Sequence, residues 1–176
     1  MQECYMLRLS AFSSPVVLSR LAKTAMVGAL GTFGLIVALN NVTDYNSNFQ
    51  FVRHVLSMDT TFRGNSLMWR AISQPVLWHL FYGLIILGEA ATGLLFAIAA
   101  CQMGARLLAP QDTFRVAKKF VPVATALGFL IWFFGFSVVG AEWFLMWQSQ
   151  AWNGQQPAFR FFITMLAVCI YVQQPE

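Results

Sequence analysis

Charged side chains are scarce in this sequence of 176 residues, and their scarcity excludes a soluble protein. Only 10% of the residues are Asp, Glu, Lys or Arg, and 58% are hydrophobic, whereas ordinary soluble domains carry about 25% charged residues. So few charges cannot cover the surface of a soluble fold. The net charge of +4 comes from dispersed Lys and Arg and not from a dense basic patch, so we expect no nucleic-acid partner.

Cysteine is equally rare, and its placement does not suggest a metal or redox site. Cys4, Cys101 and Cys169 form no C-x-x-C pair, and no histidine lies at ligand spacing from them. We expect all three to lie at or near the cytoplasmic side, where thiols stay reduced, and to serve as small apolar residues.

Catalytic motifs are missing as well. The sequence contains no glycine-rich phosphate loop, no G-x-S-x-G, no H-E-x-x-H and no C-x-x-C-H. We therefore expect no enzymatic activity, no metal and no cofactor.

Long apolar runs are what the sequence does contain. A membrane-spanning helix needs about 20 apolar residues, because the hydrocarbon layer is about 30 Å thick. Four runs, at about 23–39, 76–100, 120–147 and 157–172, predict a single all-α domain over 1–176 with four transmembrane helices. The first run also resembles a signal peptide, but no A-x-A-like cleavage site follows it, so we expect a retained helix.

The distribution of Lys and Arg predicts the orientation in the membrane. The amino-terminal segment and the second connection carry seven basic residues: Arg8, Arg20, Lys23, Arg106, Arg115, Lys118 and Lys119. The first connection and the border of the third carry four: Arg53, Arg63, Arg70 and Arg160. Because cytoplasmic loops are enriched in Lys and Arg, both termini are expected to be cytoplasmic.

The first connection, at about 40–74, has the pattern of an amphipathic helix. Phe51, Val52, Val55, Met58 and Phe62 fall on one helical face, whereas Gln50, Arg53, His54 and Ser57 fall on the other. Such a helix lies on the membrane surface or packs over the bundle.

Glu89, in the middle of the second run, is the first candidate for a functional residue. A charged carboxylate facing lipid there costs several kcal/mol, so we expect it to face the bundle interior or a partner, or to be protonated. Tyr82 lies two turns earlier on the same face. Glu89 either binds a proton or ligand, or donates one interhelical hydrogen bond. His79, about ten residues before it, is a candidate haem or relay residue, or an interfacial histidine bonded to a loop.

Polar residues expected outside the membrane form a second candidate site. They are Asn41, Asp44, Arg53, His54, Asp59, Arg70 and Glu142, accompanied by Asn40 and Arg63. They are expected either to cap one another and the helix ends, or to form the mouth of a ligand site or a docking surface.

Five segments together resemble a known family. They are NNVTDYNSNF at 40–49, HVLSMDTTF at 54–62, MWRAI at 68–72, GAEWFLMWQS at 140–149 and WNGQ at 152–155. They resemble the bacterial predicted small integral membrane proteins, domain of unknown function 2165. The resemblance runs from about Arg20 to the last helix and implies a bacterial inner-membrane protein with four spans. It implies no activity and no catalytic residue.

Three functions remain open at this point. The leading hypothesis is a non-enzymatic accessory or structural subunit of a membrane assembly, or a homo-oligomer, because small residues on the first two spans permit close helix contacts. Its partners would be membrane lipids and other membrane-protein subunits. The alternatives are a small proton-linked transporter, channel or ligand-binding protein that uses Glu89, and a quinone- or haem-binding electron carrier built around His79 and the tryptophans.

Overall fold

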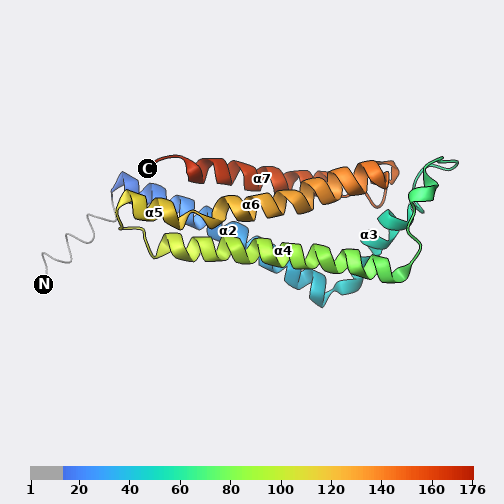
Figure 1. Cartoon of the computed structure of the whole chain (residues 1–176), viewed down its shortest axis with the longest axis horizontal. Helices are drawn as coiled ribbons and strands as arrows, with labels where there is room; N and C mark the ends of the chain where they lie inside the picture. The colour runs from blue at the N-terminus through green and yellow to red at the C-terminus, as the bar shows by residue number, and fades with distance from the viewer. Residues whose placement is uncertain (1–13) are drawn as a thin grey trace, which may run out of the picture.

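The computed structural model describes residues 14–176, and within this range the chain is helical and contains no strand. Four helical segments are long and apolar enough to cross a membrane: Pro15–Thr43, Pro75–Gly104, Gln111–Trp143 and Gln155–Gln173. They run along the long axis of the molecule, and the start of the first lies at the same end as the C-terminus (Figure 1). The predicted all-helical class with four membrane spans is confirmed.

The first two spans, α2 (Pro15–Thr43) and α4 (Pro75–Gly104), both open with a proline. Proline suits the first helical turn, because the N–H group that it lacks would have no intrahelical partner at that position. Helix α2 begins at Pro15, before the apolar run predicted to start near 23. Within this basic segment, the side chain of Arg20 donates hydrogen bonds to the carbonyl oxygens of Leu107 and Ala109.

Helices α2 and α4 pack backbone to backbone through small residues. A Cβ added to Gly34 would lie 2.8 Å from Gly93 Cα, and a Cβ added to Gly93 would lie 2.6 Å from the Leu35 nitrogen. Gly31 meets Ala97 in the same way. Small residues let membrane helices approach closely and gain dispersion contacts along their length. The close contact predicted from these residues is therefore made within one chain.

The third span consists of three pieces. Helix α5 (Gln111–Ala117) is followed by α6 (Phe120–Phe129), which continues as the π-helical segment η2 (Leu130–Trp143). In a π-helix each N–H bonds to the carbonyl five residues earlier, as the 3.0 Å bond from Phe144 N to Val139 O shows. The helix ends at Trp143, and the short 3-10 turn η3 (Met146–Gln148) leads toward α7 (Gln155–Gln173).

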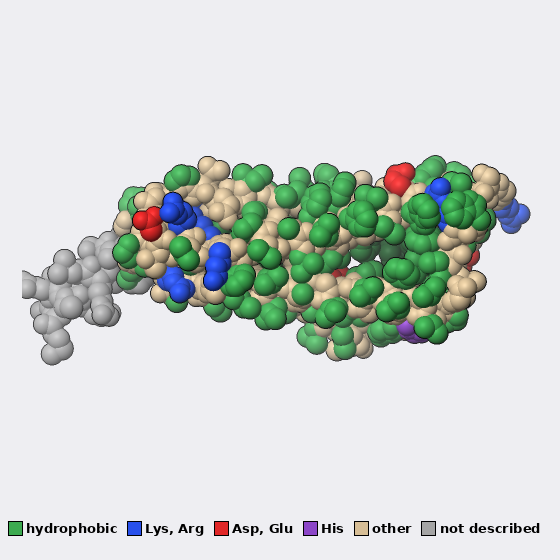
Figure 2. All heavy atoms as spheres, viewed as in Figure 1, with side chains coloured by type: hydrophobic (Ala, Val, Ile, Leu, Met, Phe, Trp, Pro, Cys, Tyr) green, Lys and Arg blue, Asp and Glu red, His purple; other side chains and the backbone are tan. Residues whose placement is uncertain are grey.

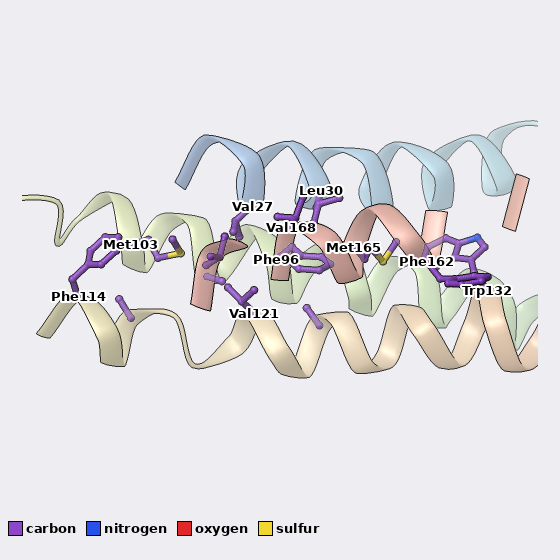
Figure 3. Packing of buried hydrophobic residues seen from close by; sticks show 14 of the residues in the cluster. Val27, Leu30, Phe96, Met103, Phe114, Val121, Trp132, Phe162, Met165 and Val168 are labelled. Atoms are coloured by element: carbon purple, nitrogen blue, oxygen red, sulfur yellow. The ribbon is translucent and has the colours of Figure 1, made fainter. Parts of the chain in front are cut away.

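The main hydrophobic core fills the space between the four spans (Figure 3). It includes Val27 and Leu30 of α2, Phe96 and Met103 of α4, Phe114 of α5, Val121 and Trp132 of the third span, and Phe162, Met165 and Val168 of α7. Aromatic rings dominate one end, where Trp132 packs against Phe33 and Phe161 at centroid distances of 6.2 and 5.7 Å. Outside this core, large apolar side chains point outward on every span, as expected of helices surrounded by lipid.

The first connection folds as α3 (Tyr45–Ser57), followed by a loop and the short 3-10 turn η1 (Met68–Arg70). Val52, Val55 and Leu56 of α3 are buried. The expectation that Phe62 continues the apolar helical face is wrong, because the helix ends at Met58, whose φ of 54° is left-handed. Phe62 lies beyond this cap and is 60% exposed.

A buried ionic cluster closes the opposite end of the bundle. The Lys23 and Lys118 ammonium groups both donate hydrogen bonds to Oε1 of Glu176, and each of these three side chains is less than 5% exposed. The cysteines take no part: Cys101 is exposed and Cys169 is half-buried, and both are free thiols. Cys4 and Arg8 lie outside the described residues.

Candidate functional site

Glu89 lies halfway along α4 and is only 3% exposed. Its carboxylate oxygen Oε2 accepts a 2.7 Å hydrogen bond from the side-chain amide of Asn41, near the end of α2. Among residues 14–176, no hydrogen bond reaches its other oxygen. Glu89 therefore faces the bundle interior, as one of the sequence alternatives required, and retains a free acceptor.

Asn41 is held in place from two further directions. Its side-chain oxygen accepts a 2.6 Å hydrogen bond from the amide of Asn48 on α3. Its backbone carbonyl accepts a 3.2 Å hydrogen bond from the buried Tyr82 hydroxyl on α4. Because the side-chain oxygen of Asn41 accepts from Asn48, its side-chain NH₂ group is the one that faces Glu89. Contacts among α2, α3 and α4 thus fix the orientation of the Glu89 carboxylate.

Glu89 lines a cavity of about 370 Å³, here called the polar chamber. Its walls come from α2, α3, α4, η2, the loop at 151–154 and the start of α7. Asn41, Asn48, Tyr82 and Asn153 supply polar groups, and Trp132, Trp152 and Phe161 supply aromatic faces. No lysine, arginine or histidine is among the lining residues. The chamber is therefore a mixed aromatic and polar site with a single acidic group.

A second cavity, of about 350 Å³, lies between α4, η2 and α3 and is here called the apolar chamber. Every side chain that lines it is apolar, including Phe81 and Leu84 of α4 and Ile131, Phe134 and Val139 of η2. The molecule is visibly hollowed between α4 and η2 on the face drawn in Figure 2. Phe81 and Leu84 are 38% and 54% exposed, so the cavity opens on the side where the helices meet lipid.

The two chambers share a wall. Phe51 and Val52 of α3, Ile85 of α4 and Phe136 of η2 line both of them. The Phe51 and Phe136 rings stack at a centroid distance of 5.9 Å. Gly154 fits against both rings, since a Cβ there would approach them to 2.8 and 3.0 Å. Side chains, and not backbone alone, separate the polar chamber from the apolar one.

His79, the third candidate residue on the second span, does not join Glu89. Its Nδ1 lies 2.8 Å from the Tyr45 hydroxyl, and its ring stacks on Phe49 at a centroid distance of 4.2 Å. His79 is exposed, whereas Tyr82 is 1% exposed and contacts the Asn41 carbonyl. The structure therefore brings Tyr82 and Glu89 together around Asn41 and places His79 in a contact with α3.

The residues expected to form one outer polar cluster are dispersed. Asn41 joins Glu89, Asp44 accepts a hydrogen bond from Ser47, and Arg53 reaches Gln50 and the Trp78 ring. His54 pairs with Asp59 at 2.8 Å and stacks on Trp152. Arg70 lies over the rings of Trp143 and Trp69 and donates to the Trp143 carbonyl, and Glu142 is exposed. Some of these contacts are local, and others join segments that are distant in the sequence, such as Arg70 to Trp143 and His54 to Trp152.

Sequence reasoning missed the residues that shape the two chambers. Trp132 and Phe136 are aromatic residues in an apolar run, and Phe51 lies on the apolar face of the first connection. Nothing in their spacing distinguishes a cavity wall from packed core. Asn48 was passed over too, although its position seven residues after Asn41 was a usable signal.

The chemistry available in this site is hydrogen bonding and charge pairing. Glu89 offers an acceptor fixed in direction by Asn41, and tryptophan and phenylalanine faces attract cations. Within the described part of the chain, no three His, Cys, Asp or Glu residues are grouped so as to hold a metal ion. The arrangement fits recognition of a donor group.

Comparison with known proteins concerns the whole chain and not this site alone. A family model described as predicted small integral membrane protein (DUF2165) matches residues 19–175. No curated protein matches the chain, and no solved structure does. The match includes α4, α7 and the whole third span, and all of α2 except its first four residues. The chain therefore belongs to this family of predicted small integral membrane proteins, as its sequence resemblance indicated.

Proposed function

We propose that this protein is a non-enzymatic membrane protein that binds a small molecule at Glu89. The observation that carries the proposal is the free oxygen of a buried carboxylate in a chamber of about 370 Å³. Ligand pockets typically measure about 300–1,000 Å³ and combine apolar walls with a few fixed polar groups. Asn41, Asn48 and Tyr82 hold this polar group in one orientation.

A role as subunit or homo-oligomer is a second proposal, with a different basis from the one that the sequence suggested. The small residues of α2 and α4 are occupied by each other, so they are not an argument for a partner. Support comes instead from the end of the molecule formed by the first and third connections. The edge-to-face pairs Trp69–Trp143 and Phe62–Trp147 are exposed there. Such an aromatic surface suits lipid headgroups or another membrane protein.

Orientation and location complete the proposal. Figure 2 shows Lys and Arg side chains gathered at the end where α2 begins and the chain ends. The basic residues in the segments at this end are Arg20 and Lys23 near the start of α2, and Arg106, Arg115, Lys118 and Lys119 between the end of α4 and the start of α6. Under the rule that cytoplasmic ends are basic, both termini face the cytoplasm of a bacterial inner membrane. Helix α3 is then an amphipathic helix on the extracytoplasmic side. A fluorescent protein fused after residue 176 is expected to fluoresce, and alkaline phosphatase fused there to stay inactive; the reverse result contradicts this orientation.

Co-purification tests ligand binding at Glu89. The parent, Glu89→Gln and Glu142→Gln proteins are extracted from their own membranes in mild detergent, and bound small molecules are compared by mass spectrometry. Gln keeps the shape but loses the charge, so we expect a molecule present in the parent to fall by about tenfold or more in Glu89→Gln, because a charged hydrogen bond of about 1.5–3 kcal/mol is lost. Glu142 is exposed and serves as the matched control.

The same samples test both proposals, because their bound small molecules report on ligand binding and their native mass reports on assembly. Identical extracts from all three proteins, with equal unfolding midpoints, would rule out ligand binding through the Glu89 charge. The native mass of the parent particle decides the second proposal, because a single chain with only detergent and lipid would exclude an assembly.

A further inference from the structure

We propose that the ligand is a long-chain amine, which enters sideways from the lipid between α4 and η2. Its ammonium group pairs with Glu89 in the polar chamber, and its hydrocarbon chain lies in the apolar chamber. This inference rests on the proposed function, because it names the chemical class bound at Glu89.

The charge of the head group follows from what surrounds Glu89. Among residues 14–176, no basic side chain lines the polar chamber, so this part of the chain provides no counter-charge there. A buried carboxylate is costly unless it is paired and hydrogen-bonded. Asn41 supplies the hydrogen bond to one oxygen, and the other oxygen is available to accept a hydrogen bond from a donor in the chamber. Trp132 and Trp152 in the chamber walls favour a donor that is also a cation.

The same surroundings disfavour other membrane molecules as the head group. A phospholipid or fatty acid would bring a phosphate or carboxylate next to Glu89, and the chamber has no lysine or arginine to offset two like charges. Like charges that share a site repel strongly in a low-dielectric interior. An amine without a phosphate is the head group that the chamber accepts.

The tail follows from the second cavity. The apolar chamber holds about 350 Å³, and the residues that line it within 14–176 are all apolar. Apolar cavities bind hydrocarbon. The apolar chamber opens beside Phe81 and Leu84, and it meets the polar chamber at Phe51 and Phe136. An amphipathic molecule that crosses this wall places its polar head in the polar chamber and its hydrocarbon tail in the apolar chamber.

Entry past the shared wall requires side-chain motion and no backbone opening. The wall consists of the rings of Phe51 and Phe136 with Ile85 and Val52. Neighbouring η2 is π-helical, and π-helical segments are frequent at functional sites. The hydrocarbon tail of a ligand that lies between the rings of Phe51 and Phe136 would separate this stacked pair.

Photolabelling tests the inference with a probe of known structure. The protein in lipid nanodiscs is exposed to dodecylamine that carries a diazirine at the far end of its chain, and the labelled peptides are mapped by mass spectrometry. We expect labelling of the η2 residues around Ile131–Val139. Labelling should fall by about tenfold in Glu89→Gln, which corresponds to the loss of about 1.4 kcal/mol of binding. Dodecanol with the same diazirine should label weakly and independently of Glu89.

A matched pair of glycine substitutions separates the tail from the head. Gly135→Phe fills the apolar chamber, where an added Cβ would meet nothing closer than 3.8 Å. Gly83→Phe is the control, because Gly83 lines neither chamber and no atom lies within 4 Å of its added Cβ. We expect Gly135→Phe to lose dodecylamine labelling yet retain Glu89-dependent binding of isotope-labelled butylamine. Gly83→Phe should behave like the parent, and all variants must keep the parent unfolding midpoint.

The outcomes distinguish this inference from the proposed function. If Gly135→Phe labels as the parent does, or if dodecanol labels as strongly as dodecylamine, the long-chain amine is overturned, while Glu89-dependent butylamine binding would still support a ligand site. If neither amine depends on Glu89, the amine class is wrong. The co-purified native molecule then decides whether Glu89 binds anything else.

Discussion

Replacing Gly93 with leucine is expected to lower the free energy of unfolding by about 3 kcal/mol or more, because overpacking a tight contact forces a backbone shift. A Cβ at this position would approach the Leu35 nitrogen to 2.6 Å and the Gly34 carbonyl carbon to 2.8 Å. These are backbone atoms of α2 and cannot move aside as a flexible side chain would. The whole α2–α4 contact must therefore widen.

Gly83→Leu is the matched control for this prediction. It introduces the same side chain into the same helix, at a position where no atom lies within 4 Å of the new Cβ. Any gain in helix propensity, about 1 kcal/mol for replacing glycine, is common to both variants. Thermal unfolding in one detergent should therefore show a marked fall in the midpoint for Gly93→Leu alone. Equal midpoints for the two variants would mean that α2 and α4 are not packed this closely.

Replacing Glu176 with glutamine is expected to destabilise the other end of the bundle by about 3 kcal/mol at neutral pH, as does removal of one partner from a buried ion pair. Oε1 of Glu176 accepts hydrogen bonds from Lys23 and Lys118, and all three side chains are buried. Without the carboxylate, the two ammonium groups remain close together and keep only the carbonyl oxygens of Gln174 and Pro175 as acceptors within residues 14–176.

The pH dependence of this effect has a definite sign. Burial by itself would raise the pKa of Glu176, but hydrogen bonds from Lys118 and Lys23, together with their charges, outweigh burial and hold the pKa below its ordinary value. The unfolded chain takes up a proton near pH ~4.3, before the folded one does. The stabilisation is therefore complete above that pH and is lost as the pH falls through the lower folded pKa.

Unfolding midpoints at pH 7 and below pH ~4 measure both parts of the prediction. The gap between the parent and Glu176→Gln should be wide at pH 7 and should shrink in acid. Asp112→Asn is the control, since the Asp112–Arg115 pair has side chains that are 86% and 75% exposed and such pairs contribute at most about 1 kcal/mol. A Glu176→Gln protein as stable as the parent at pH 7 would show that the Lys23–Glu176–Lys118 cluster does not stabilise this end of the bundle.

The candidate site was predicted in its centre and missed in its walls. Glu89 stands out in any reading of the sequence, because a carboxylate in the middle of a span needs a partner. Its partner Asn41 was assigned to an outer cluster, because the end of α2 was placed near 39 and the helix continues to Thr43. One further helical turn cannot be inferred from an apolar run that ends in two asparagines.

His79 and the outer residues show a second limit. Sequence spacing gives the angle of a residue around its own helix, but it does not give the neighbour that this face meets. Tyr45 and Phe49 of α3 contact His79, and its own helix does not reveal this contact.

The sequence by itself determined that this is a four-span membrane protein with one acidic group in mid-membrane and with small residues on the first two spans that permit close helix contacts. Composition, run length and small-residue spacing are local properties, and water and lipid act on each span almost independently. Only the tertiary structure decided that the small residues of α2 and α4 meet each other and which side chain meets Glu89. It also decided that Glu89 lines one cavity with a second cavity beside it, and that two lysines share Glu176 at the far end. These features depend on how helices distant in sequence pack together, and spans that are apolar nearly all round leave the choice of contacting faces to packing.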